Sequence, residues 1–119
     1  MEYEFKYSDD CLIIRLSGTP RENERLLARE YMAPHLRLPY QRIIVDLENI
    51  NESRNLYIML GVLNTIKKEF QLLGGKIKLC CLKPTFYRYL QANRLEKVFD
   101  IGQSMEIAKL TFEGKSSEN

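Results

Sequence analysis

Apolar and charged residues alternate at the start of the chain. Tyr3, Phe5 and Tyr7 are separated by charged side chains, which is the period-two pattern of a half-buried strand. A Ser-Asp-Asp turn follows, and the apolar run Cys11–Leu16 predicts a second strand. The two strands together indicate a hairpin whose first strand lies at a sheet edge.

After this hairpin, apolar residues recur at the spacing of a helix. Thr19 is a suitable N-cap and Pro20 a suitable first helical residue. The predicted helix continues through Leu26, Leu27, Glu30, Tyr31 and Pro34. Either Pro34 or Pro39 ends it, and the β-branched run Arg42–Leu47 then predicts a short strand that is buried on both faces.

The longest amphipathic segment spans residues 56–73, and the pair Gly74-Gly75 is a suitable C-cap for it. Its apolar stripe consists of Leu56, Met59, Leu60, Leu63, Ile66, Phe70 and Leu73. The later elements are predicted as a strand at Lys76–Leu82, a helix at Pro84–Arg94, a strand at Val98–Asp100 and a helix at Ser104–Phe112.

The predicted order is therefore β-β-α-β-α-β-α-β-α. Alternating strands and helices predict an α/β fold with a mixed sheet of four or five strands and helices packed on it. We expect a single domain over residues 1–112 and a polar tail over residues 113–119. The periodicities predict a core that includes Ile14, Ile44, Leu47, Leu60, Leu63, Phe70, Leu79 and Phe86.

Composition narrows the classes of function. The sequence is 45% hydrophobic and carries a net charge of only +2, so a strong field for nucleic acid or an anionic membrane is not expected. The chain contains no uninterrupted apolar run long enough to cross a membrane, and its first residues do not resemble a signal peptide. We expect a cytoplasmic protein.

Three cysteines are present: Cys11, Cys80 and Cys81. Neighbouring residues on a strand point to opposite faces, so at most one of the adjacent pair is expected to face Cys11. The sequence has no Cys-x-x-Cys motif and a single histidine. We therefore expect reduced thiols, no metal site, no disulfide framework and no cofactor.

The sequence holds no recognisable catalytic constellation. His35 lies between Pro34 and Leu36, a position typical of a helix end, and no nucleophile elbow or phosphate loop occurs. Asp46, Glu48 and Glu52 follow the buried strand and could bind a cation, although a solvated loop is the commoner outcome. We expect a protein that is not an enzyme.

The start of the long helix is the most informative surface. In open α/β sheets, ligands and partners lie at the carboxyl ends of the strands. We predict a docking surface there that comprises Glu52, Ser53, Arg54, Asn55, Tyr57, Ile58, Gly61 and Val62. A glycine within a helix lets another group approach the backbone closely, either a neighbouring element or a partner protein.

Several segments together resemble the STAS family, and in particular bacterial anti-sigma-factor antagonists. The matching segments are Leu16–Gly18, Ile43–Leu47, Leu60-Gly61, Leu73–Ile77, the helix from Pro84, and Leu95–Phe99. The resemblance covers about residues 3–112 and implies a STAS-like fold. It also implies a non-catalytic regulatory module in bacterial signalling and transcription regulation, which binds a protein partner such as a kinase-like anti-sigma factor. Some family members are thought to sense nucleotides or lipids instead, which is the alternative function.

The sequence departs from the family at its regulatory turn. Many members carry a phosphorylated serine where the long helix begins. Counting from Asp46-Leu47 places that position at Asn55, and counting back from Gly74-Gly75 places it at Tyr57. Ser53 is the only nearby hydroxyl that could substitute, so it is the one possible phosphosite.

Overall fold

The computed structural model describes residues 1–8, 11–36, 42–51 and 56–110, and over these residues it contains one five-stranded sheet. The strands are β1 (Glu2–Ser8), β2 (Cys11–Gly18), β3 (Arg42–Ile50), β4 (Lys76–Cys80) and β5 (Asp100–Gly102). Their order in the sheet is β1-β2-β3-β4-β5, with β1 antiparallel to β2 and all later pairs parallel. The predicted hairpin and the mixed α/β sheet are confirmed.

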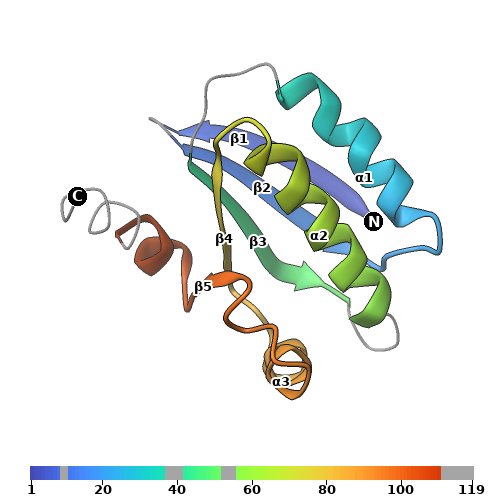
Figure 1. Ribbon diagram of the computed structural model, residues 1–119, viewed down its shortest axis with the longest axis vertical. Helices are drawn as coiled ribbons and strands as arrows, with labels where there is room; N and C mark the ends of the chain where they lie inside the picture. Colours follow the sequence, from blue (N-terminus) through green and yellow to red (C-terminus); the bar gives the residue numbers. More distant parts are fainter. Residues whose placement is uncertain (9–10, 37–41, 52–55, 111–119) are drawn as a thin grey trace.

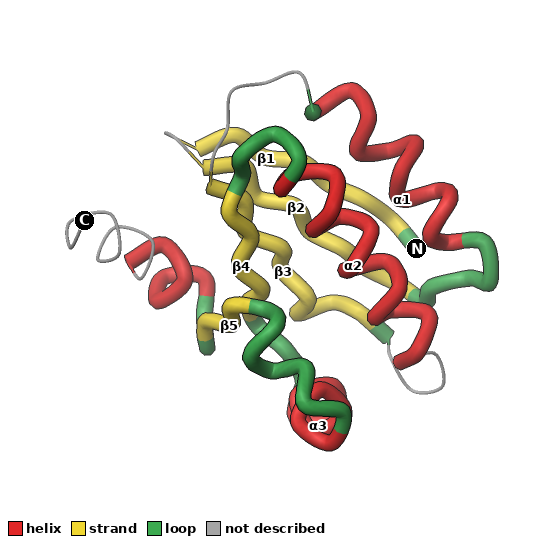
Figure 2. The backbone as a smooth tube through the Cα atoms, in the orientation of Figure 1, coloured by secondary structure: helices red, strands yellow, loops and turns green. Residues whose placement is uncertain are grey.

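Helices cover the two faces of the sheet unequally (Figure 1, Figure 2). They are α1 (Glu24–Met32), a 3₁₀ turn at Ala33–His35, α2 (Leu56–Gln71), α3 (Pro84–Ala92) and a helical segment at 105–110. The parallel strands advance across the sheet in one direction, so right-handed connections place α1, α2 and α3 on the same face. All three helices contribute to one large core, whereas Ala108 of the last segment packs on the opposite face beside Ile13 and Ile44.

Helix α2 follows the central part of the predicted stripe, but Leu73, which was predicted to belong to it, lies beyond the helix end and is 58% exposed. Met59, Leu63, Ile66 and Phe70 are all buried in the large core. After the helix, Gly74 takes a positive φ of 81°, and the backbone N–H of Gly75 donates to the carbonyl of Phe70 at 2.9 Å. These contacts satisfy backbone carbonyls at the helix end, as expected of a glycine C-cap.

Two neighbouring positions of α2 differ from expectation. Leu60, predicted to be a core residue, is only half-buried, whereas Val62, predicted to face a partner, is fully buried. The buried stripe of α2 is therefore centred slightly to one side of the predicted one. Every other predicted core residue is at most 3% exposed: Ile14, Ile44, Leu47, Leu63, Phe70, Leu79 and Phe86.

The start of α1 was predicted four residues too early. The helix begins at Glu24, after a turn, and neither Thr19 nor Pro20 belongs to it. The Glu24 side chain is fully buried, accepts the backbone N–H of Arg21 at 3.1 Å and accepts the hydroxyl of Tyr3 at 2.6 Å. This buried carboxylate fixes the first turn in a place that cap preferences alone do not indicate.

The large apolar residues Leu26 and Tyr31 of α1 are not the ones that it buries. Ala28 and Met32 are fully buried, whereas Leu26 is 64% exposed and Tyr31 is 50% exposed. Tyr31 instead stacks on Tyr3 of the edge strand with ring centroids 4.5 Å apart. The small side chain of Ala28 faces the core, so the buried face of α1 does not carry all of its largest apolar side chains.

Several other element boundaries differ from those predicted. β2 continues through Gly18, whereas α2 ends at Gln71 and β4 ends at Cys80. β3 continues through Ile50, so Glu48 lies in a strand and not in a turn. β5 begins at Asp100, which pairs with Lys78, two residues later than expected. α3 ends at Ala92 because Arg94 takes the left-handed conformation, with φ at 57°. Ser104 caps the last helical segment as predicted, since its hydroxyl oxygen accepts the backbone N–H of Ile107 at 3.2 Å.

Within the described ranges, no helix is long and apolar enough to span a membrane.

Candidate functional site

The structure places the predicted docking residues at different depths. Tyr57 lies in the first turn of α2 and is 78% exposed, and Ile58 beside it is half-buried. Gly61 lies one turn further and is partly accessible, but Val62 is fully buried and its side chain does not reach the surface. The remaining residues of the predicted surface, Glu52–Asn55, lie outside the described residues.

A groove runs between α1 and α2 next to Tyr57. One part of it has a volume of about 340 Å³ and is lined by Glu22, Arg25, Tyr57, Ile58, Leu60, Gly61, Asn64 and Lys68. A second part lies further along the two helices and shares Glu22, Arg25 and Lys68 with the first. The lining of the first part combines the apolar side chains of Ile58 and Leu60 and the ring of Tyr57 with charged residues of both signs.

Because Gly61 has no side chain, the side chain of Arg25 can lie directly against the backbone of α2. A Cβ atom at position 61 would lie 2.8 Å from the Cδ of Arg25 and 3.3 Å from its Cγ. The close approach that the glycine permits is therefore filled by α1 of the same chain. Arg25 is exposed, so its guanidinium group remains available at the groove.

His35, the single histidine, lies at the end of the 3₁₀ turn that follows α1. Its ring stacks on Phe5 of β1 with centroids 3.6 Å apart, and its Nδ1 is hydrogen-bonded to the hydroxyl of Tyr7. Burial lowers the pKa of this imidazole. The contacts join the α1 region to the edge strand, and none of them involves the groove.

A second cluster lies near the carboxyl ends of the central strands, on the face opposite to α2. Arg15, Asp46 and Cys80 occupy one row across β2, β3 and β4, because Arg15 pairs with Asp46 and Asp46 pairs with Cys80. The Nε of Arg15 contacts the carboxylate of Asp46 at 3.3 Å, and the backbone N–H of Glu48 donates to the same carboxylate at 3.0 Å. Asp46 is only 6% exposed, so it is not part of a solvated loop.

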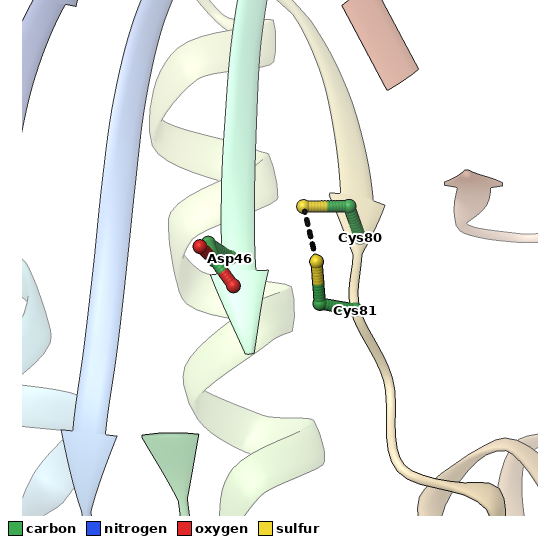
Figure 3. Close-up of side chains that lie close together, drawn as sticks. All are labelled: Asp46, Cys80 and Cys81. Atoms are coloured by element: carbon green, nitrogen blue, oxygen red, sulfur yellow. Dashed lines mark hydrogen bonds between the residues drawn. The ribbon is translucent and has the colours of Figure 1, made fainter. Parts of the chain in front are cut away.

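Cys81 joins this row from the residue directly after β4 (Figure 3). Its φ of 62° turns the chain, and its sulfur lies 3.5 Å from the sulfur of Cys80. Both cysteines therefore pack against the same small cluster as Cys11, and the expectation that they point to opposite faces is wrong. The two sulfurs and a carboxylate oxygen of Asp46 all lie within 4.8 Å of one another.

The two thiols are not activated nucleophiles. Burial, followed by the hydrogen bond with Cys81 and the nearby carboxylates, raises the pKa of the Cys80 thiol. Burial also raises the pKa of Cys81, although its hydrogen bond with Cys80 opposes that shift. Thiols with raised pKa values stay protonated at neutral pH and react slowly.

Sequence reasoning identified Asp46 as an acidic residue after a strand but did not connect it with the cysteines. Two features that the sequence pattern does not reveal bring Asp46 and the cysteines together. They are the register of β3 against β4 and the positive φ at Cys81. The adjacent cysteine pair was the only signal in the sequence.

Comparison with solved structures finds proteins of the same fold. No family model matches the sequence, and no curated protein matches it. Among solved structures, a candidate anti-sigma factor antagonist from Thermotoga maritima has a TM-score of 0.74 and 20% identity, with 92% of each chain covered. A variant of RsbS from Moorella thermoacetica has a TM-score of 0.75 and 12% identity, covering 98% of this chain and 99% of its own.

SpoIIAA of Bacillus in its phosphorylated form has a TM-score of 0.63 and 16% identity, with 92% of this chain and 99% of SpoIIAA covered. These proteins are STAS domain proteins. The TM-scores establish a shared fold, and the low identities limit the conclusion to the fold, so the STAS-like fold expected from the sequence is confirmed.

Proposed function

From the STAS fold as premise, we propose that this protein is a non-catalytic regulatory module that docks onto a partner protein through the start of α2. The proposed partner is a kinase-like anti-sigma factor or another protein of bacterial signalling. Similar solved structures are described as anti-sigma factor antagonists, which supports this class of partner. Another similar structure belongs to the stressosome, described as a signal integration and transduction hub, which supports a scaffold role as an alternative setting.

Tyr57 is the observation on which the proposal rests. A tyrosine that is 78% exposed in the first turn of a long helix leaves a large apolar ring in water. Tyrosine and arginine are enriched among the residues that dominate binding energy at protein interfaces. Arg25 lines the same groove as Tyr57, so the two residue types occur together on this surface.

Binding measurements with Tyr57→Ala test the proposal. Partners would be captured from the native cells by the wild-type chain and identified, and affinity would then be measured with the purified partner. We expect Tyr57→Ala to weaken binding at least tenfold, the effect of losing a dominant contact of about 1.4 kcal/mol or more. Tyr87→Ala is the matched control, because Tyr87 is also exposed but lies on α3.

Equal affinity of the two variants and the wild type would place the interface elsewhere. Val62→Asp is not a suitable probe, because Val62 is fully buried and a charge there would destabilise the fold. Ile58→Asp is the better second variant, since Ile58 is half-buried beside Tyr57.

We also infer that docking is not switched by the serine phosphorylation that the family resemblance implies. The similar protein SpoIIAA is described in an unphosphorylated and a phosphorylated form. Both counts along the sequence place a residue other than serine, Asn55 or Tyr57, at the switch position. An asparagine cannot accept a phosphate, and a tyrosine requires a different class of kinase. A constitutive binder, regulated by its abundance or by competition between partners, fits this sequence.

Mass spectrometry of the protein isolated from its own cells tests this inference. We expect no stoichiometric phosphate on Ser53 and normal partner binding by Ser53→Ala. Phosphate on Ser53 together with partner release by Ser53→Asp would contradict it, because a phosphate adds nearly two negative charges to the docking surface.

A further inference from the structure

The geometry points to a binding site for one thiophilic divalent cation, Zn²⁺ in the first instance, held by the thiolates of Cys80 and Cys81 and the carboxylate of Asp46. The sequence offered Asp46 as one of three carboxylates that could bind a cation, but it did not connect this residue with the two cysteines, because neighbouring residues of a strand normally diverge. The proposal is independent of the docking function.

The distances fit a bridging metal ion better than a bond between the sulfurs. Two thiolates at about 2.3 Å from a tetrahedral Zn²⁺ lie about 3.8 Å apart. The sulfurs of Cys80 and Cys81 are 3.5 Å apart, so they need to move by only a few tenths of an ångström.

A disulfide would require a larger change. Its sulfurs must approach to about 2.04 Å, and the Cα atoms that it joins usually lie 4.4–6.8 Å apart. The Cα atoms of consecutive residues joined by a trans peptide lie only about 3.8 Å apart. The pair is therefore better placed to chelate a metal ion than to form a disulfide.

The third ligand is already oriented. The Asp46 carboxylate is held by the side chain of Arg15 and by the backbone N–H of Glu48. Each carboxylate oxygen has two lone pairs, so it can accept one hydrogen bond and still bind a metal ion. Such hydrogen bonds around a ligand raise metal affinity by fixing its direction.

Charge balance also favours a dication at this position. Zn²⁺ displaces the protons of both thiols, and the resulting two thiolates and the carboxylate carry three negative charges in a largely buried site, where Asp46 is 6% exposed and Cys80 is fully buried. A divalent cation together with the guanidinium of Arg15, which contacts Asp46, offsets these three charges. The nearby carboxylate of Glu48, which also acts on both thiols, adds to the attraction for a cation. Buried charges that are compensated in this way avoid the desolvation penalty of an isolated ion.

The backbone at Cys81 is consistent with a site selected for its sulfur atoms. A non-glycine residue with φ at 62° is unfavourable by roughly 1–2 kcal/mol, and cysteine has no side-chain oxygen to offset this. That conformation is what places the second sulfur beside the first. With three protein ligands, the fourth position of a tetrahedral ion stays open to water, and the partial exposure of Cys81 gives solvent access to it.

Zn²⁺ binding by the full-length chain tests the proposal. The protein would be reduced with a phosphine and freed of metal, and its Zn²⁺ affinity measured in competition with a chromophoric chelator. We expect one Zn²⁺ per chain, and affinity at least about tenfold lower in Cys81→Ser and in Asp46→Asn. Co²⁺ substituted for Zn²⁺ should give a thiolate-to-metal charge-transfer band that is reduced in Cys81→Ser.

Cys11→Ser is the matched control. Cys11 packs in the same small cluster but is not one of the three ligands, so its loss should leave affinity within about twofold. Arg15→Gln removes the partner of Asp46 while keeping every ligand, and thermal melts of all variants establish that they are folded. Failure of the wild type to take up stoichiometric Zn²⁺, or an equal loss of affinity in Cys11→Ser and Cys81→Ser, would overturn the proposal.

Discussion

At the scale of single residues, the most sensitive reporter of folding is the imidazole of His35. It lies nearly parallel to the ring of Phe5, with an interplanar angle of 16°, and its Nδ1 is paired with the hydroxyl of Tyr7. Burial disfavours the charged form of the ring and therefore lowers the pKa of this group.

We predict that His35 titrates below the usual value of about 6.5 in the folded chain. Its contribution to stability is then present above pH 6.5 and is lost as the pH falls through the lowered pKa. Proton NMR measures this directly, because the sequence contains one histidine. Phe5→Leu should return the pKa towards 6.5, and an unshifted pKa in the wild type would show that the ring is not packed against β1.

The positions of single side chains were the features that the sequence predicted least well. Strand alternation correctly predicted that Ile14 and Ile44 are buried, but it could not show that Cys81 leaves the strand with a positive φ. Similarly, the periodicity of α2 could not decide between Leu60 and Val62, which lie on the two borders of the same stripe. Which of the two is buried depends on how α2 packs in the folded core, and the sequence of α2 alone does not show this.

At the scale of elements, one of the contacts between α1 and α2 is made by a side chain that crosses a glycine. The Cδ and Cγ atoms of Arg25 occupy the space that a side chain at Gly61 would fill. Arg25 is flexible and exposed, so it can move aside at low energetic cost.

Gly61→Ala should therefore stabilise the fold by up to about 1 kcal/mol, because alanine is the better helix former in a helix interior. Urea denaturation at constant m-value measures the change. Gly75→Ala is the contrasting variant. Its new Cβ would meet the Phe70 carbonyl at 3.0 Å and Ile43 at 2.9 Å, so we expect a loss of about 1–3 kcal/mol. Destabilisation by both variants would show that Arg25 is fixed in place.

Element boundaries were less predictable than element order. The sequence pattern indicated every strand and helix of the described chain in the right order, because apolar periodicity reports which segments have a buried face. It placed α1 too early because Thr19-Pro20 has the composition of a helix start, whereas the buried carboxylate of Glu24 determines the first turn. β3 runs on to Ile50 because its pairing with β2 continues there, with Gly18 opposite Ile50.

At the scale of the whole molecule, stability depends on the core between the sheet and its three covering helices. Phe70 and Leu63 of α2 lie in this core at 3% and 1% exposure. Truncation of either side chain leaves a cavity that surrounding residues from several elements cannot fill.

Phe70→Ala is expected to lower the free energy of unfolding by about 3–5 kcal/mol. Leu73→Ala is the matched control from the turn that follows α2, because Leu73 is 58% exposed and should change stability by less than about 0.5 kcal/mol. Denaturant melts that show similar losses for both variants would contradict the assignment of the core.

The order of strands in the sheet has a consequence for how the chain folds during its synthesis. Every strand after β1 pairs with the strand that precedes it in the sequence. When a strand emerges from the ribosome, the strand with which it pairs has therefore already been synthesised. Growth of the sheet then requires no earlier segment to be displaced and no late strand to insert between two others. The contacts of Ala108 with Ile13 and Ile44 join the last described helix to the second and third strands. This closure spans almost the whole described sequence and is therefore expected to be the final and slowest step of assembly.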